Sequence, residues 1–321
     1  MLAAYATRVD PNDPISGLVV GQRPDPEPRA GWAVVTVKAA ALNHHDLWTL
    51  RGVGIRQEQL PMILGGDAAG IDENGNEVVV HSVVSSPEWA GDETLDPKRS
   101  LLSEVYDGTL AEKVLVPSRN LVPKPASLSW AEAACLPTAW LTAYRMLFVK
   151  AGLQPGMTVL VQGSAGGVST AAIALAKAAG VRVWVTGRSE QKKMAALELG
   201  ADQAFDPNGR LPERVDVVID NVGQATWAHS LKSLKPGGTL VTCGATSGPN
   251  PGSDLYRVFF LQLRILGSTM GTRDELQQLL ALLDTTGLRP MIDSVLPLED
   301  AAAGLKRMND GDVQGKIVLQ P

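Results

Sequence analysis

A glycine-rich turn lies between a strand-like apolar run and an Ala-rich helical run, and glycines in that context can bind phosphate groups. The segment reads TVLVQGSAGGVSTAAIALAKAAG from Thr158 to Gly180. In such a turn the first glycine makes a tight bend, a later one lets backbone N–H groups approach a pyrophosphate, and the helix directs its positive end at that anion. A purely structural strand-to-helix turn is the alternative. We predict a dinucleotide site whose contacts are Gly163, Ser164, Ala165, Gly166, Gly167 and Val168.

The end of the next predicted strand indicates which nicotinamide cofactor would bind. NAD sites place an Asp or Glu there, where it accepts a hydrogen bond from the ribose 2′-hydroxyl. The sequence VWVTGRSEQKK has Thr186 and Gly187 at that point instead. The side chains that follow could hold the 2′-phosphate of NADP(H), unless they only form a solvated helix start next to Glu190. We predict NADP(H), held by Arg188, Ser189 and Lys192.

These groups need a sheet to position them, and the chain after Leu128 alternates strand-like with helical runs. The longer strand candidates are nearly continuous apolar runs, which is typical of parallel strands buried on both faces. The six candidates are Thr158–Gln162, Val181–Thr186, Gln203–Phe205, Val215–Asp220, Thr239–Cys243 and Leu263–Gly267. They predict an α/β fold with a doubly wound, six-stranded parallel sheet.

The flanking regions have a different pattern. In residues 33–117 short β-rich runs, AVVTVKA, EVVVHSVV and LAEKVLVP, are separated by Gly, Pro, Asn and Asp, which predicts a mainly-β region. Beyond Gly271 we predict a helix ending at Gly287, a strand in MIDSVLPL, a helix around Glu299–Asn309 and a final strand in GKIVLQP. We expect this C-terminal tail to return and complete the β-rich domain.

Composition and charge exclude several classes of protein. With 321 residues and 45% hydrophobic content the chain can bury a large core, and its net charge of −5 offers no basic surface for nucleic acid. The first residues lack the pattern of a secretory signal, and no apolar run reaches the roughly 20 residues that span a bilayer. Cys135 and Cys243 are too few for a disulfide framework or a zinc cluster, and we expect both to be buried. We predict a soluble, cytoplasmic protein without nucleic-acid or membrane partners.

Motifs spread over nearly the whole chain resemble those of the medium-chain dehydrogenase/reductase superfamily. They are AAALNHHDLWTLRG, LPMILGGDAAG, EAACLPTAWLTAYRML, VQGSAGGV, DNVG and the terminal GKIVL. The resemblance implies a GroES-like, mainly-β catalytic domain formed by residues 1–122 and 272–321. It also implies an inserted Rossmann domain of residues 123–271, with the cofactor in the cleft. Within the superfamily, the chain looks like the zinc-free, quinone-oxidoreductase-like branch.

Zinc-dependent members of the superfamily have Cys, His and Cys ligands where this chain has Asn43, Gly66 and Thr138. The four closely spaced cysteines of the structural zinc lobe are absent as well. The adjacent His44 and His45, in a loop or strand, would point in different directions and could not chelate one tetrahedral metal. We therefore predict that no metal is bound.

Without a metal, a simple ketone lacks the Lewis acid that stabilises a developing alkoxide. A conjugated acceptor spreads the incoming negative charge onto a distant oxygen, where hydrogen-bond donors can stabilise it. The predicted donors facing the nicotinamide are Asn43, Thr138 and Thr142, and His44 or His45 could deliver a proton. By resemblance His44 binds the cofactor phosphate and His45 relays protons, with ordinary structural histidines as the alternative.

The resemblance also places cofactor contacts at the carboxyl ends of the last three strands, where ligands bind in such sheets. These contacts are Asn221, Val222, Gly244, Ala245, Thr269 and Met270. Lys316 could reach the cofactor or close the cleft, unless it only belongs to a turn before an edge strand. Asp46 and Asp67 are acidic in relatives, and without a metal they could simply anchor loops. The expected pocket residues, which could equally be ordinary core, are Trp48, Leu50, Ile55, Trp140, Phe259 and Phe260.

The predicted activity is NADP(H)-dependent transfer of a hydride to a quinone or an α,β-unsaturated carbonyl compound, without a metal. Two alternatives are reduction of an enoyl thioester, and NADPH binding by a sensor or structural protein with vestigial turnover. No motif identifies the small-molecule carbonyl or quinone substrate. By resemblance we expect a homodimer joined along the edge strand Leu263–Gly267.

Overall fold

A parallel sheet of six strands forms the centre of one of two compact units in the computed structural model, which describes residues 1–321. This unit, Thr142–Met270, has the strand order β13-β12-β11-β14-β15-β16, and every neighbouring pair is parallel. Its strands are β11 (Thr158–Gln162), β12 (Arg182–Thr186), β13 (Gln203–Phe205), β14 (Val215–Asp220), β15 (Leu234–Thr242) and β16 (Arg264–Gly267). The predicted doubly wound sheet is confirmed.

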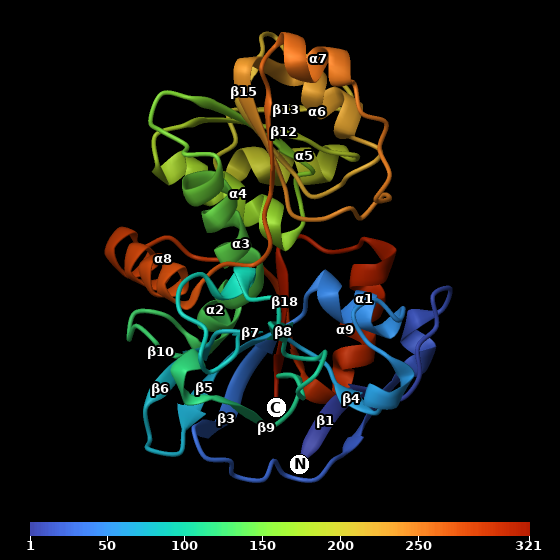
Figure 1. Ribbon diagram of the computed structural model, residues 1–321, viewed down its shortest axis with the longest axis vertical. Coiled ribbons are helices and arrows are strands. Elements are labelled where there is room, and N and C mark those ends of the chain that lie inside the picture. Colours follow the sequence, from blue (N-terminus) through green and yellow to red (C-terminus); the bar gives the residue numbers. More distant parts are fainter. The chain divides into compact units, whose positions relative to one another are not determined.

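Helices flank the strands of this sheet (Figure 1), and they are α4 (Gly167–Ala178), α5 (Glu190–Glu198), α6 (Trp227–Ser233) and α7 (Leu255–Phe260). All five residues of β11 are buried, because β12 and β14 pair with it on either side and α4 packs against it. The apolar strand residues that identified the sheet in the sequence form its core, with Leu160, Trp184, Val218 and Leu240 in one cluster. Burial of such side chains stabilises the fold by about 1.5–3 kcal/mol each.

The other unit combines Met1–Leu141 with Gly271–Pro321, so both ends of the chain build it. Its largest sheet has the order β10-β6-β5-β3-β18-β17, and β9 also pairs with β3. Its strands are β1 (Leu2–Ala6), β2 (Leu18–Gln22), β3 (Trp32–Ala41), β4 (Met62–Ile63), β5 (Asp67–Asp72), β6 (Glu77–Val80), β7 (Val83–Val84), β8 (Ser100–Leu101), β9 (Lys113–Pro117), β10 (Leu121–Pro123), β17 (Ile292–Pro297) and β18 (Lys316–Gln320). Figure 1 shows β18 beside the N-terminal strand β3, with which it pairs antiparallel, so the tail completes the β-rich domain as predicted.

The helices of this unit are α1 (His44–Leu50), α2 (Trp130–Ala134), α8 (Arg273–Thr286) and α9 (Ala301–Asp310). Helix α8 begins at a capping box in which Thr272 and Glu275 satisfy each other's backbone N–H groups, and it ends at Gly287, whose φ of +72° suits glycine. Its leucines at positions 276, 279, 280 and 283 are buried along one face, at the spacing of a helix packed on a core. None of the helices is both long enough and apolar enough to traverse a lipid bilayer.

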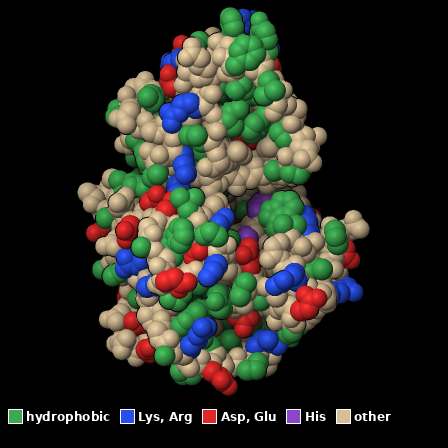
Figure 2. All heavy atoms as spheres, viewed as in Figure 1, with side chains coloured by type: hydrophobic (Ala, Val, Ile, Leu, Met, Phe, Trp, Pro, Cys, Tyr) green, Lys and Arg blue, Asp and Glu red, His purple; other side chains and the backbone are tan.

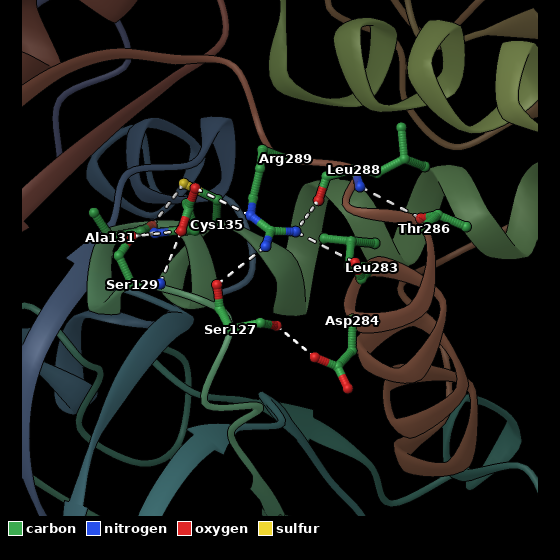
Figure 3. A network of polar contacts seen from close by, with 10 residues as sticks. Ser127, Ser129, Ala131, Cys135, Leu283, Asp284, Thr286, Leu288 and Arg289 are labelled. Carbon is green, nitrogen blue, oxygen red and sulfur yellow. Dashed lines mark hydrogen bonds and ion pairs between the residues drawn. The ribbon is translucent and has the colours of Figure 1, made fainter.

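Arg289 fastens the end of α8 to the chain before α2 (Figure 3). Its guanidinium donates hydrogen bonds to the carbonyl oxygens of Leu283 (3.3 Å) and Ser127 (3.1 Å), and it lies 3.5 Å from the carboxylate of Glu132. The hydroxyl of Ser127 in turn donates to Asp284. These contacts hold the returning tail against a segment 162 positions earlier in the sequence.

The boundary between the units lies after Leu141, and residues 123–141, which the resemblance assigned to the Rossmann domain, pack with the first unit. Helix α2 contacts β3 and β5 there. Four helical stretches follow one another across the boundary: α2, a π-helical turn (Leu136–Trp140), α3 (Leu141–Tyr144) and a second π-helical turn (Arg145–Lys150). Because the helical character continues, the sequence pattern carries no sign of where one unit ends.

Three local predictions were wrong. His44 and His45 begin helix α1 rather than lying in a loop or strand. Phe259 and Phe260 are 64% and 67% exposed on α7, so they line neither a pocket nor the core. Cys243 is only half-buried.

Candidate active site

The carboxyl ends of the Rossmann strands line up at one edge of the sheet. The register pairs Gln162 with Asp220, Asp220 with Thr242, and Thr242 with Gly267, which are the last residues of four strands. The predicted cofactor contacts that directly follow these ends or the end of β12 are Gly163, Ser164, Ala165, Gly166, Gly167, Val168, Arg188, Ser189, Asn221, Val222, Gly244, Ala245, Thr269 and Met270. Ligands bind outside this edge in doubly wound sheets, so the arrangement fits a dinucleotide.

The glycine-rich turn has the geometry of an anion site. Gly163 has a φ of +86°, a left-handed conformation that favours glycine, and its N–H donates to Thr186 Oγ1 over 3.1 Å. Gly166 caps α4, no side chain caps this helix of 12 residues, and a Cβ at Gly166 would meet no atom within 4 Å. No side chain therefore accepts from the first N–H groups of α4, and a pyrophosphate can take that place.

Glycine stands at the end of β12, where a larger side chain would collide with two neighbouring side chains. A Cβ built on Gly187 would lie 2.6 Å from Ser164 Oγ and 2.7 Å from Lys193 Cγ, so an Asp or Glu there would require both of these side chains to shift. Arg188 follows and is exposed, and the hydroxyl of Ser189 caps helix α5. An exposed guanidinium suits a phosphate better than a ribose hydroxyl.

Sequence reasoning missed that Asp220 organises the turn after β14. Its buried Oδ1 accepts hydrogen bonds from the N–H groups of Val222 (2.9 Å) and Gly223 (3.0 Å). The hydroxyls of Thr226 and Ser230 donate to Oδ2 over 2.9 Å and 2.7 Å. The signal was present in DNVG, because an aspartate that accepts from the N–H two residues on forms an Asx turn. This network fixes the backbone at Val222, a predicted nicotinamide contact.

In the other unit, Lys316 lies inside the protein and not in an exposed turn. Its side chain is 3% exposed, and its ammonium donates to the carbonyl oxygen of Leu42 (2.7 Å), to Asn43 Oδ1 (2.6 Å) and to Asp67 Oδ2 (3.1 Å). Since an ammonium has three N–H donors, all are used. This geometry disagrees with the prediction that Lys316 reaches the cofactor; the lysine instead fixes the amide orientation of Asn43.

Asp46 anchors two loops of the same cluster. Its buried carboxylate accepts hydrogen bonds from the backbone N–H of Asn43 (2.8 Å) and from that of Gly65 (3.0 Å). Burial raises the pKa of Asp46 to about 6, although the Asn43 N–H and the charges of His45 and Lys316 oppose the shift. The Asn43 amide nitrogen donates to the carbonyl oxygen of Ala41 over 3.2 Å, which leaves its second N–H for a ligand.

His45 is paired with a residue that the sequence did not reveal. Its Nε2 lies 3.1 Å from Glu104 Oε1, and its Nδ1 lies 3.3 Å from Ser103 Oγ. Burial alone would lower the pKa of His45, but the hydrogen bond with Glu104 and the charges of Asp46, Glu104 and Asp67 raise it overall. The pair joins positions 59 apart, so no local pattern could have indicated it. The arrangement favours the protonated form of His45, which can donate its proton to a bound substrate.

His44, by contrast, opens α1 with its side chain exposed. Desolvation by the surrounding protein, with the positive charges of Lys316 and Arg51, lowers its pKa. A neutral imidazole at this helix start can donate a hydrogen bond to a phosphate but adds little charge to it.

The residues at the metal-ligand positions do not fit a zinc ion. Asn43 directs Oδ1 to Lys316, Gly66 has no side chain, and Thr138 offers a hydroxyl. A Cβ built on Gly66 would lie 3.5 Å from Thr138 Oγ1 and 3.6 Å from Ser82 Oγ, so hydroxyls face this point where zinc would need imidazole or thiolate. No group of three or more His, Cys, Asp or Glu side chains is placed to hold a metal ion.

The remaining chemical candidates are divided between the two units. Thr142, 5% exposed in α3, begins the Rossmann unit, and Lys192 is half-buried in the first turn of α5. Desolvation by the surrounding protein raises the pKa of the buried Cys135 thiol and of the half-buried Cys243 thiol to about 12, so neither is a thiolate at neutral pH. The structure thus brings together one group of cofactor residues around the strand ends and one polar cluster around Asn43.

Known proteins resemble this chain in both units. The family model of the alcohol dehydrogenase GroES-like domain matches residues 29–126, and that of the zinc-binding dehydrogenases matches residues 167–285. An acryloyl-coenzyme A reductase of Sulfurisphaera tokodaii is 30% identical over 331 residues, covering 96% of this chain and 98% of the relative. The chain belongs to the medium-chain dehydrogenase/reductase superfamily. As a member it is an oxidoreductase with a nicotinamide cofactor.

Solved structures of this superfamily share the fold over the full length. A structure described as an NAD-dependent alcohol dehydrogenase has a TM-score of 0.91 and 36% identity, with 100% of both chains covered. A 2-octenoyl-CoA carboxylase reductase in complex with NADP and 2-octenoyl-CoA has a TM-score of 0.90 and 25% identity, covering 99% of this chain and 87% of that one. The match to the zinc-binding model does not restore the ligands that this chain lacks.

Proposed function

We propose that this medium-chain dehydrogenase/reductase is an NADPH-dependent, metal-independent reductase of α,β-unsaturated carbonyl compounds, with enoyl thioesters as its natural acceptors. The observation that carries the proposal is the replacement of the three metal ligands by Asn43, Gly66 and Thr138. A simple ketone would leave its developing alkoxide without a Lewis acid. A conjugated carbonyl needs only hydrogen-bond donors at its oxygen, and the unit that contains Asn43 and Thr138 offers such donors.

Two similar proteins support a thioester over a quinone as the acceptor. The relative from Sulfurisphaera tokodaii is named for acryloyl-coenzyme A reduction, and one solved structure holds 2-octenoyl-CoA beside NADP. Both compounds are conjugated thioesters. We therefore place the enoyl thioester, which the sequence left as an alternative, ahead of the quinone.

The cofactor would be held by the edge of the Rossmann sheet. The uncapped N-terminus of α4 would bind the pyrophosphate, and Arg188 the 2′-phosphate. When bound, NADPH supplies the hydride that joins the β-carbon of the acceptor. His45, whose pKa is raised by Glu104, would then provide the proton for the α-carbon. The solved structure with 36% identity is described as NAD-dependent, so the preference for NADPH needs its own measurement.

The experiment is a panel of acceptors offered to the purified protein with NADPH or NADH, with metal content measured on the same sample. We expect oxidation of NADPH with crotonyl-CoA and 2-octenoyl-CoA, slower oxidation with 2-cyclohexenone, and none with butanal, which is not conjugated. Faster turnover of benzoquinone than of every thioester would return the assignment to a quinone reductase. Tight NADPH binding without oxidation by any acceptor would support the sensor alternative instead.

We also propose a homodimer joined along β16. This strand pairs only with β15, so its outer edge is open. Hydrophobic side chains gather over the preceding helix α7, at the top of Figure 2, where Leu255, Tyr256, Phe259 and Phe260 are 64–69% exposed. A patch of large apolar residues beside an open sheet edge is typical of a protein interface.

A further inference from the structure

A serine that no motif singled out carries a buried hydroxyl without a partner. Ser82 is 1% exposed, and its Oγ has no hydrogen-bond partner in the protein. Leaving such a group unpaired inside a protein is costly, so an unpaired buried hydroxyl calls for a ligand or a functional reason. The backbone around Ser82 makes hydrogen bonds within the protein, so only the side-chain hydroxyl lacks a partner.

This hydroxyl and a second one face the same small space. A Cβ built on Gly66 would lie 3.6 Å from Ser82 Oγ and 3.5 Å from Thr138 Oγ1, and Ser82 Oγ has no hydrogen-bond partner, so it does not bond Thr138. Gly66 and Thr138 are half-buried, so the space is accessible from outside. An oxygen atom would have to lie somewhat nearer to each hydroxyl than that Cβ to accept from both, and the missing side chain of Gly66 leaves it room.

The protein holds Ser82 rigidly. The side-chain amide of buried Asn120 donates to the carbonyl oxygens of His81 (2.7 Å) and Val83 (2.8 Å), the residues before and after Ser82. The Ser82 carbonyl accepts from the N–H of Leu102 over 3.1 Å. A donor that is already oriented needs no rearrangement when charge develops opposite it.

The backbone of Gly66 is held in the same way. Before it, the N–H of Gly65 donates to Asp46 (3.0 Å), and the Gly65 carbonyl accepts from the N–H of Thr109 (3.1 Å). After it, the carbonyl of Asp67 accepts from the Thr109 hydroxyl over 2.9 Å. The backbone at Ser82 and the backbone at Gly66, on the two sides of the space, are therefore both held in place by hydrogen bonds within the protein.

We infer that Ser82 and Thr138 bind the carbonyl oxygen of the acceptor, in the space that Gly66 leaves open. This inference rests on the proposed function and names the oxygen site of that reaction. As the hydride and its electron pair join the β-carbon, the C=C electrons move toward the carbonyl and negative charge builds on its oxygen. The two hydroxyls keep their protons and stabilise that charge, and the proton that completes the product adds at the α-carbon.

Four variants test the inference by steady-state kinetics with NADPH and crotonyl-CoA. Ser82→Ala removes one donor and should lower kcat/KM about 100-fold, as loss of a single oxyanion donor does elsewhere. Gly66→Ala places its Cβ at ordinary contact distances, so the protein should fold, but the methyl group fills the oxygen site and activity should fall at least as far. Thr138→Val should behave like Ser82→Ala, and Thr138→Ser should restore most of the activity.

Thr49→Val is the matched control. Thr49 is fully buried in α1, and its Oγ1 also lacks a partner, but nothing places it near Gly66 or Thr138. Both Ser82→Ala and Thr49→Val remove an unpaired buried hydroxyl, so neither should lower Tm. Only Ser82→Ala should lose activity. If Ser82→Ala keeps wild-type kinetics, or loses stability in parallel with activity, the inference is overturned.

A second measurement does not depend on turnover and separates this inference from the proposed function. The carbonyl stretch of ¹³C-labelled butyryl-CoA, a saturated thioester, is recorded by infrared difference spectroscopy in the presence of NADP⁺. Hydrogen bonds from Ser82 and Thr138 should shift the stretch to lower frequency in the wild type, and Ser82→Ala should reverse part of that shift. If the wild type reduces no acceptor yet shows this shift, the oxygen site stands and the proposed reaction fails. Absence of butyryl-CoA binding, or an identical stretch in Ser82→Ala, overturns the oxygen site whatever the kinetics show.

Discussion

Replacing Lys316 by methionine should destabilise the unit that contains it far more than an exposed lysine would. The lysine is 3% exposed and its partner Asp67 is fully buried, so Lys316→Met leaves an uncompensated carboxylate inside the protein. Breaking a buried ion pair in this way costs about 3–5 kcal/mol. Two more acceptors, the carbonyl oxygen of Leu42 and Asn43 Oδ1, lose their donor and oppose recovery.

The matched control is Lys306→Met, because Lys306 pairs with Asp310 one helical turn away and both are exposed (68% and 47%). An exposed pair of this kind contributes little to stability, because water and salt screen the two charges. The double variant Lys316→Met with Asp67→Leu removes both buried charges, so it should cost less than the sum of the single changes by at least about 2 kcal/mol.

Hydrogen–deuterium exchange of peptides from β18 is the suitable assay, because the two units need not unfold together. A loss of about 3–5 kcal/mol lowers protection at least about 100-fold, whereas Lys306→Met should leave it nearly unchanged. If Lys316→Met costs under about 1 kcal/mol, or if the cycle with Asp67 shows no coupling, then the ammonium is not buried in this ion pair and the orientation of Asn43 must have another cause.

Three further outcomes follow from the structure. Arg188→Ala should weaken NADPH binding about 10- to 100-fold and leave NADH binding unchanged, by fluorescence titration, because only the 2′-phosphate loses a charge-assisted partner; equal losses for both cofactors would place the phosphate elsewhere. The pKa of His45 is raised in the folded protein, so its pairing with Glu104 adds stability that is fully present below pH 6.5, the ordinary histidine pKa, and is lost as the pH rises through the folded pKa. Because the hydrogen bond with Glu104 is one cause of this shift, Glu104→Gln should lower the His45 pKa in an NMR titration. Phe260→Glu should shift a dimer to monomer in sedimentation velocity, whereas Val53→Glu, equally a change at an exposed apolar residue, should not.

Much of the fold could be predicted because its signals are local. The apolar strands and the Ala-rich helix α4 are visible in the sequence as periods and runs. The alternation of strand and helix runs along the chain then predicts a doubly wound parallel sheet. The boundary after Leu141 could not be predicted, since helical turns continue across it. The start of α1, by contrast, has a local signal, because Asn43 and Asp46 have the spacing of a capping box.

In the candidate site, too, the local features could be predicted and the long-range contacts could not. The glycine turn and the residues after each strand could be recognised in the sequence, because their expected roles depend on backbone conformation within a few positions. Glu104, the partner of His45, and the buried pair of Lys316 with Asp67 join segments 59 and 249 positions apart. Contacts over such separations depend on the sheet register, which composition and spacing do not encode.

If the proposed function is right, the cluster around Asn43 explains how an acceptor site can be held in place without a metal. In a metal site the ligand bonds themselves hold the surrounding loops at fixed distances. Here Asp46 ties the backbone of Asn43 to that of Gly65, and Lys316 ties the Asn43 side chain to Asp67. The segments on either side of Gly66 are thus cross-linked by buried charged groups. Loss of the metal ligands therefore need not loosen this part of the unit, and donors such as the Asn43 amide can remain oriented for an incoming oxygen.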